Sequence, residues 1–216
     1  FSIDTNWKLG FIGRNGKGKT TFLNLLLGKY SFVGSISAST KFDYFPYEIA
    51  DHQKEMPVVD FMEDLKPGCE MWRVVCELEE LSENAEILYR PFNTLSPGER
   101  TKALLAILFS EENEFLLIDE PTNHLDIAGT EWLEEFLSSF KGTVIVISHD
   151  RYFLDQVADR VIEIVDGHGE FYSGNYSFYI EEKQARFNLQ LKQYEQEQAK
   201  LKQLGYTVER MKGWGI

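Results

Sequence analysis

Residues 13–20 read Gly13-Arg14-Asn15-Gly16-Lys17-Gly18-Lys19-Thr20. The run fits the pattern G-x-x-x-x-G-K-[ST], and it lies between a strand candidate, Lys8 to Gly13, and a helix candidate, Thr20 to Leu27. In such a loop, glycine residues let successive backbone N–H groups point at phosphate oxygens, and the following helix presents its positive end to them. The stretch therefore predicts a phosphate-binding loop that opens a βαβ unit. A glycine-rich turn without function is the alternative.

The residue types of this loop indicate a nucleotide as the ligand. We expect the Lys19 ammonium to reach the β- and γ-phosphate oxygens, and the Thr20 hydroxyl to bind Mg²⁺. Thr21 completes the set at the start of the helix. The predicted nucleotide-binding residues are Gly13, Arg14, Asn15, Gly16, Lys17, Gly18, Lys19, Thr20 and Thr21.

Two carboxylates follow an apolar run later in the chain. Phe115 to Ile118 has the composition of a buried strand, and Asp119 and Glu120 come directly after it. Unpaired charges at such a place are costly unless a cation or a reacting water requires them. We predict that Asp119 binds Mg²⁺ and that Glu120 orients the attacking water. Two acids that merely cap a helix are the alternative.

A histidine follows a second apolar run. Ser148-His149-Asp150 comes after Val144 to Ile147, so the expected position of His149 is the carboxyl edge of the sheet, where open α/β folds bind ligands. A histidine there is by itself more often structural than catalytic. Beside the other motifs, we predict that His149 contacts the γ-phosphate, which makes Glu120 and His149 the predicted catalytic residues.

The remaining pattern predicts an α/β fold with a central, mainly parallel sheet, an antiparallel β portion and a small helical insert. Strands are expected at Phe42 to Phe45 and in a hairpin of Val161 to Val165 and Glu170 to Tyr172, around Asp166 and Gly167. Helices are expected at Val58 to Leu65, Met71 to Leu81, Ser96 to Phe109 and Glu131 to Phe140.

From Tyr179 the pattern changes to a long polar helix with one narrow apolar stripe. Its members are Phe187, Leu191, Tyr194, Leu201, Leu204, Val208 and Met211. Such a stripe indicates a partner helix, as in a coiled-coil hairpin, and a helix folded back on the domain is the alternative. We predict a nucleotide-binding domain over residues 1–175, with the insert at about 51–110, and the start of a helical linker over 176–216.

Composition narrows the function classes. The formal net charge of −13 argues against general nucleic-acid binding by the surface, although seven basic and five acidic residues nearly balance from Glu181 onward. No apolar run approaches the roughly 20 residues that cross a bilayer. The chain begins at Phe1 without a signal-like segment, and we interpret it as a fragment of a longer protein. Cys69 and Cys76 are expected to be buried free thiols.

Together these motifs resemble an ABC-type ATPase over residues 1 to about 172, which implies ATP binding and hydrolysis with Mg²⁺. The segment Leu95-Ser96-Pro97-Gly98-Glu99 resembles the LSGGQ signature of that family, with Pro97 and Glu99 as replacements. In the family, the signature closes over the ATP that the opposite cassette holds. The resemblance thus implies a second cassette as a partner, and contacts in trans from Ser96, Gly98 and Glu99.

The run Glu120 to Asp126 reads EPTNHLD and resembles the form characteristic of the ABC-F subfamily. The passage from Tyr172 to Tyr179, with the charged helix after it, resembles the ABC-F transition into the interdomain linker. Members of that subfamily are soluble and carry two cassettes joined by a helical hairpin, and many act on the ribosome. The resemblance implies a cytoplasmic translation factor or antibiotic-resistance ribosome-protection factor, whose arm reaches toward tRNA, without insertion into a membrane.

Two other functions stay open. The ATP-hydrolysing subunit of a membrane transporter would dock through the helical insert, but it has no need of the C-terminal arm. A nucleotide-dependent scaffold with negligible turnover is suggested by Pro97 and by Tyr47, which takes the place of a metal-binding glutamine of the family. Glu48 or water would then complete the metal shell. The aromatic residue that stacks on adenine is expected near or before Phe1.

Overall fold

The computed structural model describes residues 3–4, 6–14, 16–37, 40–165 and 167–213, with side chains described as far as residue 202. Asn15 of the predicted loop and Asp166 of the predicted hairpin therefore lie outside the described residues. The chain divides into two units, Phe1–Tyr176 and Ser177–Ile216. Among the helices of the described part, none is both long and apolar enough to span a membrane.

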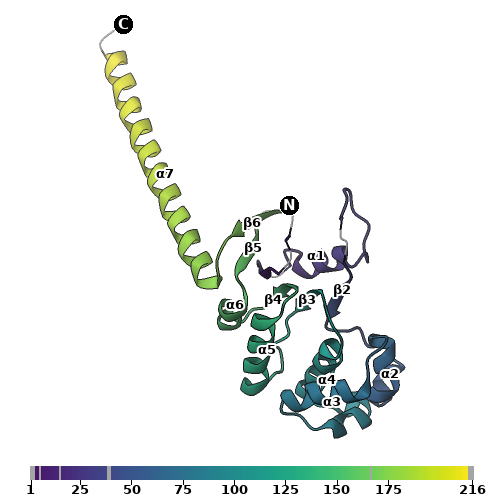
Figure 1. Ribbon diagram of the computed structural model, residues 1–216. Helices are drawn as coiled ribbons and strands as arrows, with labels where there is room; N and C mark the ends of the chain where they lie inside the picture. Colours follow the sequence, from purple (N-terminus) through teal and green to yellow (C-terminus); the bar gives the residue numbers. More distant parts are fainter. Residues whose placement is uncertain (1–2, 5, 15, 38–39, 166, 214–216) are drawn as a thin grey trace. The chain divides into compact units, whose positions relative to one another are not determined.

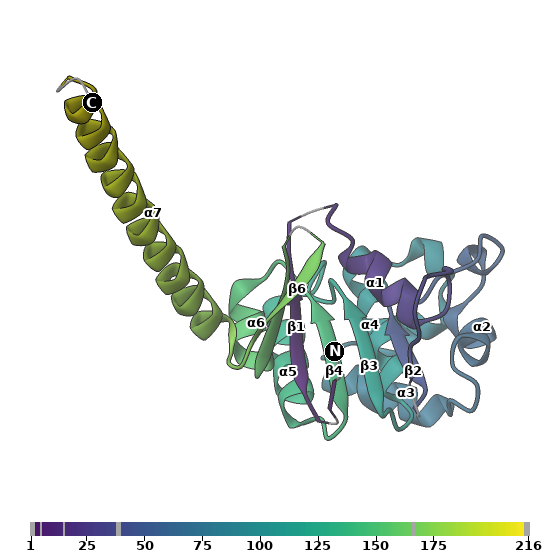
Figure 2. The same ribbon diagram turned by 90° about the horizontal axis from the view of Figure 1, so that it is seen from above.

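The first unit is built on a six-stranded sheet with the order β2-β3-β4-β1-β5-β6 (Figure 1 and Figure 2). Figure 2 shows the strands side by side. All neighbouring pairs are parallel except β5 and β6, which form an antiparallel hairpin. The α/β prediction with a mainly parallel sheet is thereby confirmed. The strands are β1 Lys8–Ile12, β2 Phe42–Phe45, β3 Phe115–Asp119, β4 Thr143–Ile147, β5 Arg160–Val165 and β6 His168–Tyr172.

Helices cover both faces of this sheet. Side chains alternate between the two faces along each strand, and in the central strands those on both faces are mainly apolar and need to be covered. Leu23 of α1 packs in one core cluster with Leu9, Leu117 and Ile145. The opposite face carries α6, since a Cβ atom on Gly10 would meet Ala158, next to α6, at 3.2 Å. Apolar residues on both faces explain why the central strands read as continuous hydrophobic runs. The helices of these two layers are α1 Lys19–Leu26, α5 Ile127–Ser139 and α6 Arg151–Val157.

A helical group lies between β2 and β3 in the sequence. It contains α2 Val58–Leu65, α3 Met71–Glu80 and α4 Pro97–Phe109, with 3₁₀ turns at Gln53–Glu55, Ala85–Tyr89 and Phe92–Thr94. All three α-helices are close to the predicted ranges.

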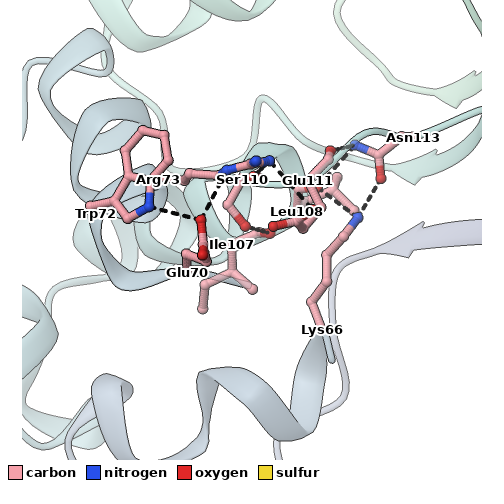
Figure 3. Close-up of polar contacts among 9 residues, drawn as sticks. All are labelled: Lys66, Glu70, Trp72, Arg73, Ile107, Leu108, Ser110, Glu111 and Asn113. Atoms are coloured by element: carbon pink, nitrogen blue, oxygen red, sulfur yellow. Dashed lines mark hydrogen bonds and ion pairs between the residues drawn. The ribbon is translucent and has the colours of Figure 1, made fainter. Parts of the chain in front are cut away.

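Two cations, Lys66 at the end of α2 and Arg73 of α3, contact the end of α4 and the loop after it (Figure 3). The buried Lys66 ammonium donates to the Leu108 carbonyl at 3.0 Å and to the side chain of Asn113. Arg73 lies 3.4 Å from both the Ser110 carbonyl and the Glu111 carboxylate. The loop that leads into β3 is therefore fixed from two sides.

Two details differ from the sequence-based prediction. Helix α5 begins at Ile127 and not at Glu131, because the Asp126 carboxylate accepts a hydrogen bond from the Gly129 N–H at 2.8 Å and caps the helix there. The prediction of two buried thiols is wrong for Cys76, which is exposed, whereas Cys69 is buried. Val74 and Leu78 of α3 face the core, and a residue midway between them in a helix points away.

Helix α7, Tyr176–Gly213, makes up almost all of the second unit. Of the predicted apolar stripe, Phe187, Leu191, Tyr194 and Leu201 are exposed. Leu204, Val208 and Met211 lie outside the described side chains. The described part of the stripe is thus an apolar helix face open to solvent.

Candidate active site

The loop from Gly13 to Thr20 connects β1 to α1. Gly18 occupies the N-cap of α1 with φ of 92°, and a Cβ atom built there would meet nothing within 4 Å. Glycine is thus required at this position for its left-handed backbone and not for lack of space. Within the described residues, no side chain caps α1, so its first N–H groups remain available to an anion.

Lys19 is the first residue of α1, and its side chain reaches back into this loop. Its side chain is buried, and its ammonium donates to the Gly13 carbonyl at 2.8 Å and to the Arg14 carbonyl at 3.5 Å. The loop therefore curves around a positive charge.

Thr20 joins the loop to the end of β3. Its hydroxyl donates to the Asp119 carboxylate with an oxygen–oxygen distance of 2.6 Å. The two residues predicted to bind Mg²⁺ are thus in direct contact. Both groups are hard oxygen ligands of the kind that Mg²⁺ prefers.

Glu120 lies next to His149 at the same edge of the sheet. The Glu120 N–H donates to the Ile147 carbonyl at 2.8 Å, which anchors this residue to β4. One carboxylate oxygen accepts from the His149 N–H at 3.3 Å, and the other lies 3.4 Å from the His149 Nε2 atom. The two predicted catalytic residues are therefore neighbours.

The environment of Glu120 changes its acidity. Burial raises the pKa of the Glu120 carboxyl, and the nearby Asp119 charge adds to this effect, while His149 and Lys19 oppose it. The higher pKa makes Glu120 a better hydrogen-bond acceptor and a better proton acceptor than an exposed glutamate.

The turn that carries His149 is held by side-chain hydrogen bonds. The Ser148 hydroxyl accepts from the Asp150 N–H at 3.0 Å and lies 3.3 Å from the Thr122 hydroxyl. The Asp150 carboxylate in turn caps α6 by accepting from the N–H groups of Tyr152 and Phe153. His149 thus extends from a fixed turn with its side chain largely exposed.

The predicted signature forms the start of α4. Ser96 and Glu99 make a capping box, in which the Ser96 N–H donates to the Glu99 carboxylate at 2.6 Å and the Glu99 N–H donates to the Ser96 hydroxyl at 3.2 Å. Pro97 occupies the first helical position, where its missing N–H breaks no bond of the helix. The replacement by proline is therefore compatible with a regular helix start.

The hydrogen bond from Ser96 and the ion pair with Arg90, whose nitrogen lies 2.7 Å from the carboxylate, hold the pKa of Glu99 below its usual range. Among the described residues, no hydrogen bond or ion pair joins Ser96, Gly98 or Glu99 to the loop of residues 13–21. The structure therefore brings together Lys19, Thr20, Asp119, Glu120 and His149, and leaves the signature apart from them.

The segment after β2 contains Tyr47, at the place of a metal-binding glutamine, and Glu48, the carboxylate that the sequence suggests as a metal ligand in its stead. Tyr47 is half-buried, and burial together with the charges of Asp43 and Cys69 raises the pKa of its phenol. Glu48 forms an ion pair with Lys29 at 2.6 Å.

Tyr44 of β2 lies close enough to Asp119 to be affected by its charge, and sequence reasoning missed this residue. Burial, followed by the charges of Asp119 and Glu48, raises the pKa of Tyr44 to about 12. Tyr44 of β2 pairs in register with Leu117 of β3, two residues before Asp119, so it shares a face with that carboxylate. A prediction that β2 pairs with β3 in this register would have identified Tyr44 as a neighbour of the site.

Comparison with known proteins identifies the family to which this chain is similar. Residues 1–123 match the profile of a family described as ABC transporter, and residues 162–216 match a second profile with the same description.

Three curated relatives illustrate the likeness. The chain is 36% identical to ABC transporter F family member 5 of Arabidopsis thaliana, over 83% of this chain and 27% of that protein. It is 37% identical to the ribosome protection protein VmlR of Bacillus subtilis (strain 168), over 76% and 30%, respectively. It is 36% identical to the ATP-binding protein Uup of Haemophilus influenzae, over 90% and 31%. The chain spans less than a third of the length of each of these relatives.

Solved structures agree in fold. An archaeal ribosome recycling factor, solved in complex with a ribosomal stalk protein, superimposes with a TM-score of 0.60 at 26% identity, over 76% of this chain and 33% of that one. A cobalt transport ATP-binding protein gives a TM-score of 0.66 at 20% identity, over 79% and 70%, which shows the shared fold alone.

Proposed function

Because this chain belongs to the ABC transporter family and, within it, to the F subfamily, we propose that its first unit binds ATP with Mg²⁺ and hydrolyses it to ADP and phosphate. The contact between the Thr20 hydroxyl and the Asp119 carboxylate carries this proposal. It joins a phosphate-binding loop to a metal-binding carboxylate, and the Glu120–His149 pair lies beside it. These are the parts that phosphoryl transfer to water requires.

Lys19, Thr20 and Asp119 bind the substrate. The Lys19 ammonium, which donates to loop carbonyls at present, exchanges these partners for phosphate oxygens. Thr20 and Asp119 would hold Mg²⁺, and this ion would neutralise charge on the phosphates. The described residues contain no group of three or more His, Cys, Asp or Glu side chains placed to bind a metal. Two protein oxygens suit Mg²⁺, which usually takes its other ligands from phosphates and water.

Glu120 and His149 act on the attacking water and the γ-phosphate. The Glu120 carboxylate accepts a hydrogen bond from the water and orients it for attack. His149 holds that carboxylate through its N–H and places its imidazole beside the same edge of the sheet. The raised pKa of Glu120 favours this acceptor role.

The signature acts in trans. Ser96 and Pro97 are exposed at the start of α4, so this segment is accessible to a second cassette. We expect Ser96, Gly98 and Glu99 to contact ATP that a second cassette holds. Residues 1–175 are then one cassette, with the helical insert at about 51–110, and residues 176–216 begin the linker.

The whole protein acts on the ribosome in the cytoplasm, as a translation factor or a ribosome-protection factor, with its arm directed toward tRNA. Support comes from the EPTNHLD run and from the exposed apolar stripe of α7. A relative named for ribosome protection and a related fold in a ribosome recycling factor support the same assignment.

Metal dependence tests the ATPase proposal. Mg²⁺ should tighten ATP binding by the wild-type protein, and both Asp119→Asn and Thr20→Val should remove most of this effect while metal-free ATP still binds. Titration calorimetry with and without Mg²⁺ measures both quantities. Wild-type protein that binds ATP equally well in the presence of a chelator contradicts the assignment.

Cosedimentation tests the ribosome proposal. The full-length protein with Glu120→Gln and its counterpart in any second cassette should pellet with purified ribosomes in ATP and not in ADP. Folded protein that binds ATP but stays in the supernatant in both nucleotides overturns the ribosome proposal and leaves the ATPase proposal intact.

A further inference from the structure

The first turns of α4 contact the segment that follows Glu120 at three residues, Asn123, His124 and Asp126. The Thr101 hydroxyl lies 3.5 Å from the Asn123 carbonyl. Gly98 packs against the next carbonyl, since a Cβ atom on Gly98 would lie 2.9 Å from the His124 oxygen. The third contact is the ion pair between Lys102 of α4 and Asp126. These three contacts fix the loop against the start of α4.

The third contact is made by a buried cation. The Lys102 ammonium lies 3.1 Å from the Asp126 carboxylate and 3.5 Å from the Glu83 carboxylate. The Lys102 side chain is only 6% exposed, so these two carboxylates replace the water that would otherwise solvate its charge. Lys102 thereby joins three segments: α4, the turn after α3, and the start of α5.

The segment that α4 holds has a backbone that needs support. Glu120 has φ of 52° and His124 has φ of 71°, and neither residue is glycine. L-residues adopt this left-handed conformation only where surrounding contacts impose it. The Glu120 N–H is fixed to β4, while the far end of the segment is fixed to α4 through Asp126. The orientation of the Glu120 carboxylate therefore depends on both anchors.

We propose that Lys102 is a positioning residue for Glu120: its ion pair with Asp126 locks the segment from residue 120 to 126 onto α4, so that the helix that starts with the signature controls the aim of the water-orienting carboxylate. This inference rests on the proposed ATPase function. It implies that a displacement of α4 at the signature of one cassette changes hydrolysis at the Glu120 of the same chain.

A set of variants of the full-length protein tests this. Lys102→Met keeps the length and apolar stem of the side chain and removes its charge. Lys66→Met is a matched control, because Lys66 is also buried and bonds to Leu108 of α4 and to Asn113 after it (Figure 3). Its other partner is Asp43, and among the described residues none of its polar partners lies in the segment from 120 to 126. Lys102→Arg restores a cation.

The Glu120-dependent kcat is the kcat that remains after turnover in Glu120→Gln is subtracted. Lys102→Met should reduce it by about tenfold or more, because a small misplacement of a reacting group lowers the rate strongly. The dissociation constant of ATP should change less than about twofold, and Lys102→Arg should recover most of the rate. Lys66→Met should lower thermal stability without this loss of kcat.

A double variant decides whether Lys102 acts through Glu120. If it does, Lys102→Met should cause no further loss of turnover in the Glu120→Gln background, although both changes lower the rate singly. A further loss as large as in the wild type overturns the inference, as does equal kcat for Lys102→Met and Lys66→Met at matched folded fractions. Absence of Glu120-dependent turnover in the wild type refutes the proposed ATPase function instead.

Discussion

The hydroxyl of Thr20 lies 2.6 Å from the carboxylate of Asp119, although 99 positions of the chain separate them. Thr20 lies in the first turn of α1, and Asp119 is the last residue of β3. Their contact joins two separate sequence motifs into one site.

Lys19→Ala and Glu120→Gln should separate binding from hydrolysis. Loss of the Lys19 ammonium removes the buried charge that faces the phosphates, so ATP affinity should fall. Glu120→Gln keeps the shape of the side chain but replaces one carboxylate oxygen by an NH2 group, so ATP should bind normally while turnover falls on the order of 10²-fold. Equilibrium ATP binding and steady-state phosphate release measure the two effects. Parallel loss of binding in both variants would contradict the division of roles.

The pH dependence of turnover should reveal the environment of Glu120. Because burial raises its pKa, the carboxyl takes up a proton at a higher pH than an ordinary glutamate, and kcat should fall as the pH is lowered through that value. The His149 charge lowers this pKa, so His149→Ala should move the acid limb of the profile to higher pH.

His52→Ala provides the control for this profile, because His52 lies in the loop before α2 and not at the site. The pH profile of the residual kcat should have its acid limb shifted in His149→Ala. The pH profile of kcat in His52→Ala should coincide with that of the wild type. A shift of the acid limb to lower pH in His149→Ala would show that another group controls it.

Ser96→Ala should destabilise the cassette at the start of α4. It removes the acceptor of the Glu99 N–H and breaks the capping box, which should lower the free energy of unfolding by about 1 kcal/mol. Ser96→Thr keeps the hydroxyl and should preserve most of the stability. Denaturant unfolding of the three proteins measures the difference, and an unchanged midpoint for Ser96→Ala would exclude a stabilising cap.

The two thiols should react at different rates. Cys76 is exposed on α3, whereas Cys69 is buried and its pKa is raised chiefly by that burial. A disulfide reagent should therefore modify one thiol of the native protein quickly and the second only on unfolding. Cys76→Ser should abolish the fast phase and Cys69→Ser should leave it. A fast phase that survives in Cys76→Ser would place the reactive thiol at Cys69.

Much of the site could be predicted because its residues follow regular elements. Lys19, Thr20, Asp119, Glu120 and His149 each lie just after a strand or at the start of a helix, and apolar runs mark those strands in the sequence. Parallel pairing places the carboxyl ends of these strands at one edge of the sheet, so the residues could be grouped before any side-chain contact was known.

The residues that sequence reasoning missed depend on pairings between distant elements. Tyr44 approaches Asp119 only because β2 lies beside β3 in a defined register. Lys102 looks like one polar position in an apolar helix, and its role depends on Asp126 and Glu83 from two other segments. The early start of α5 depends on whether Asp126 serves as a cap, which its own side-chain geometry decides.

The position of β4 has a consequence for synthesis of the chain. β4 lies between β1, which leads into the phosphate-binding loop, and β3, which ends at Asp119. A nascent chain that has emerged only as far as residue 142 carries both motifs but lacks the strand that sets them side by side. We therefore expect that the growing chain binds nucleotide only after Thr143–Ile147 has left the exit tunnel, because this strand places the two motifs side by side.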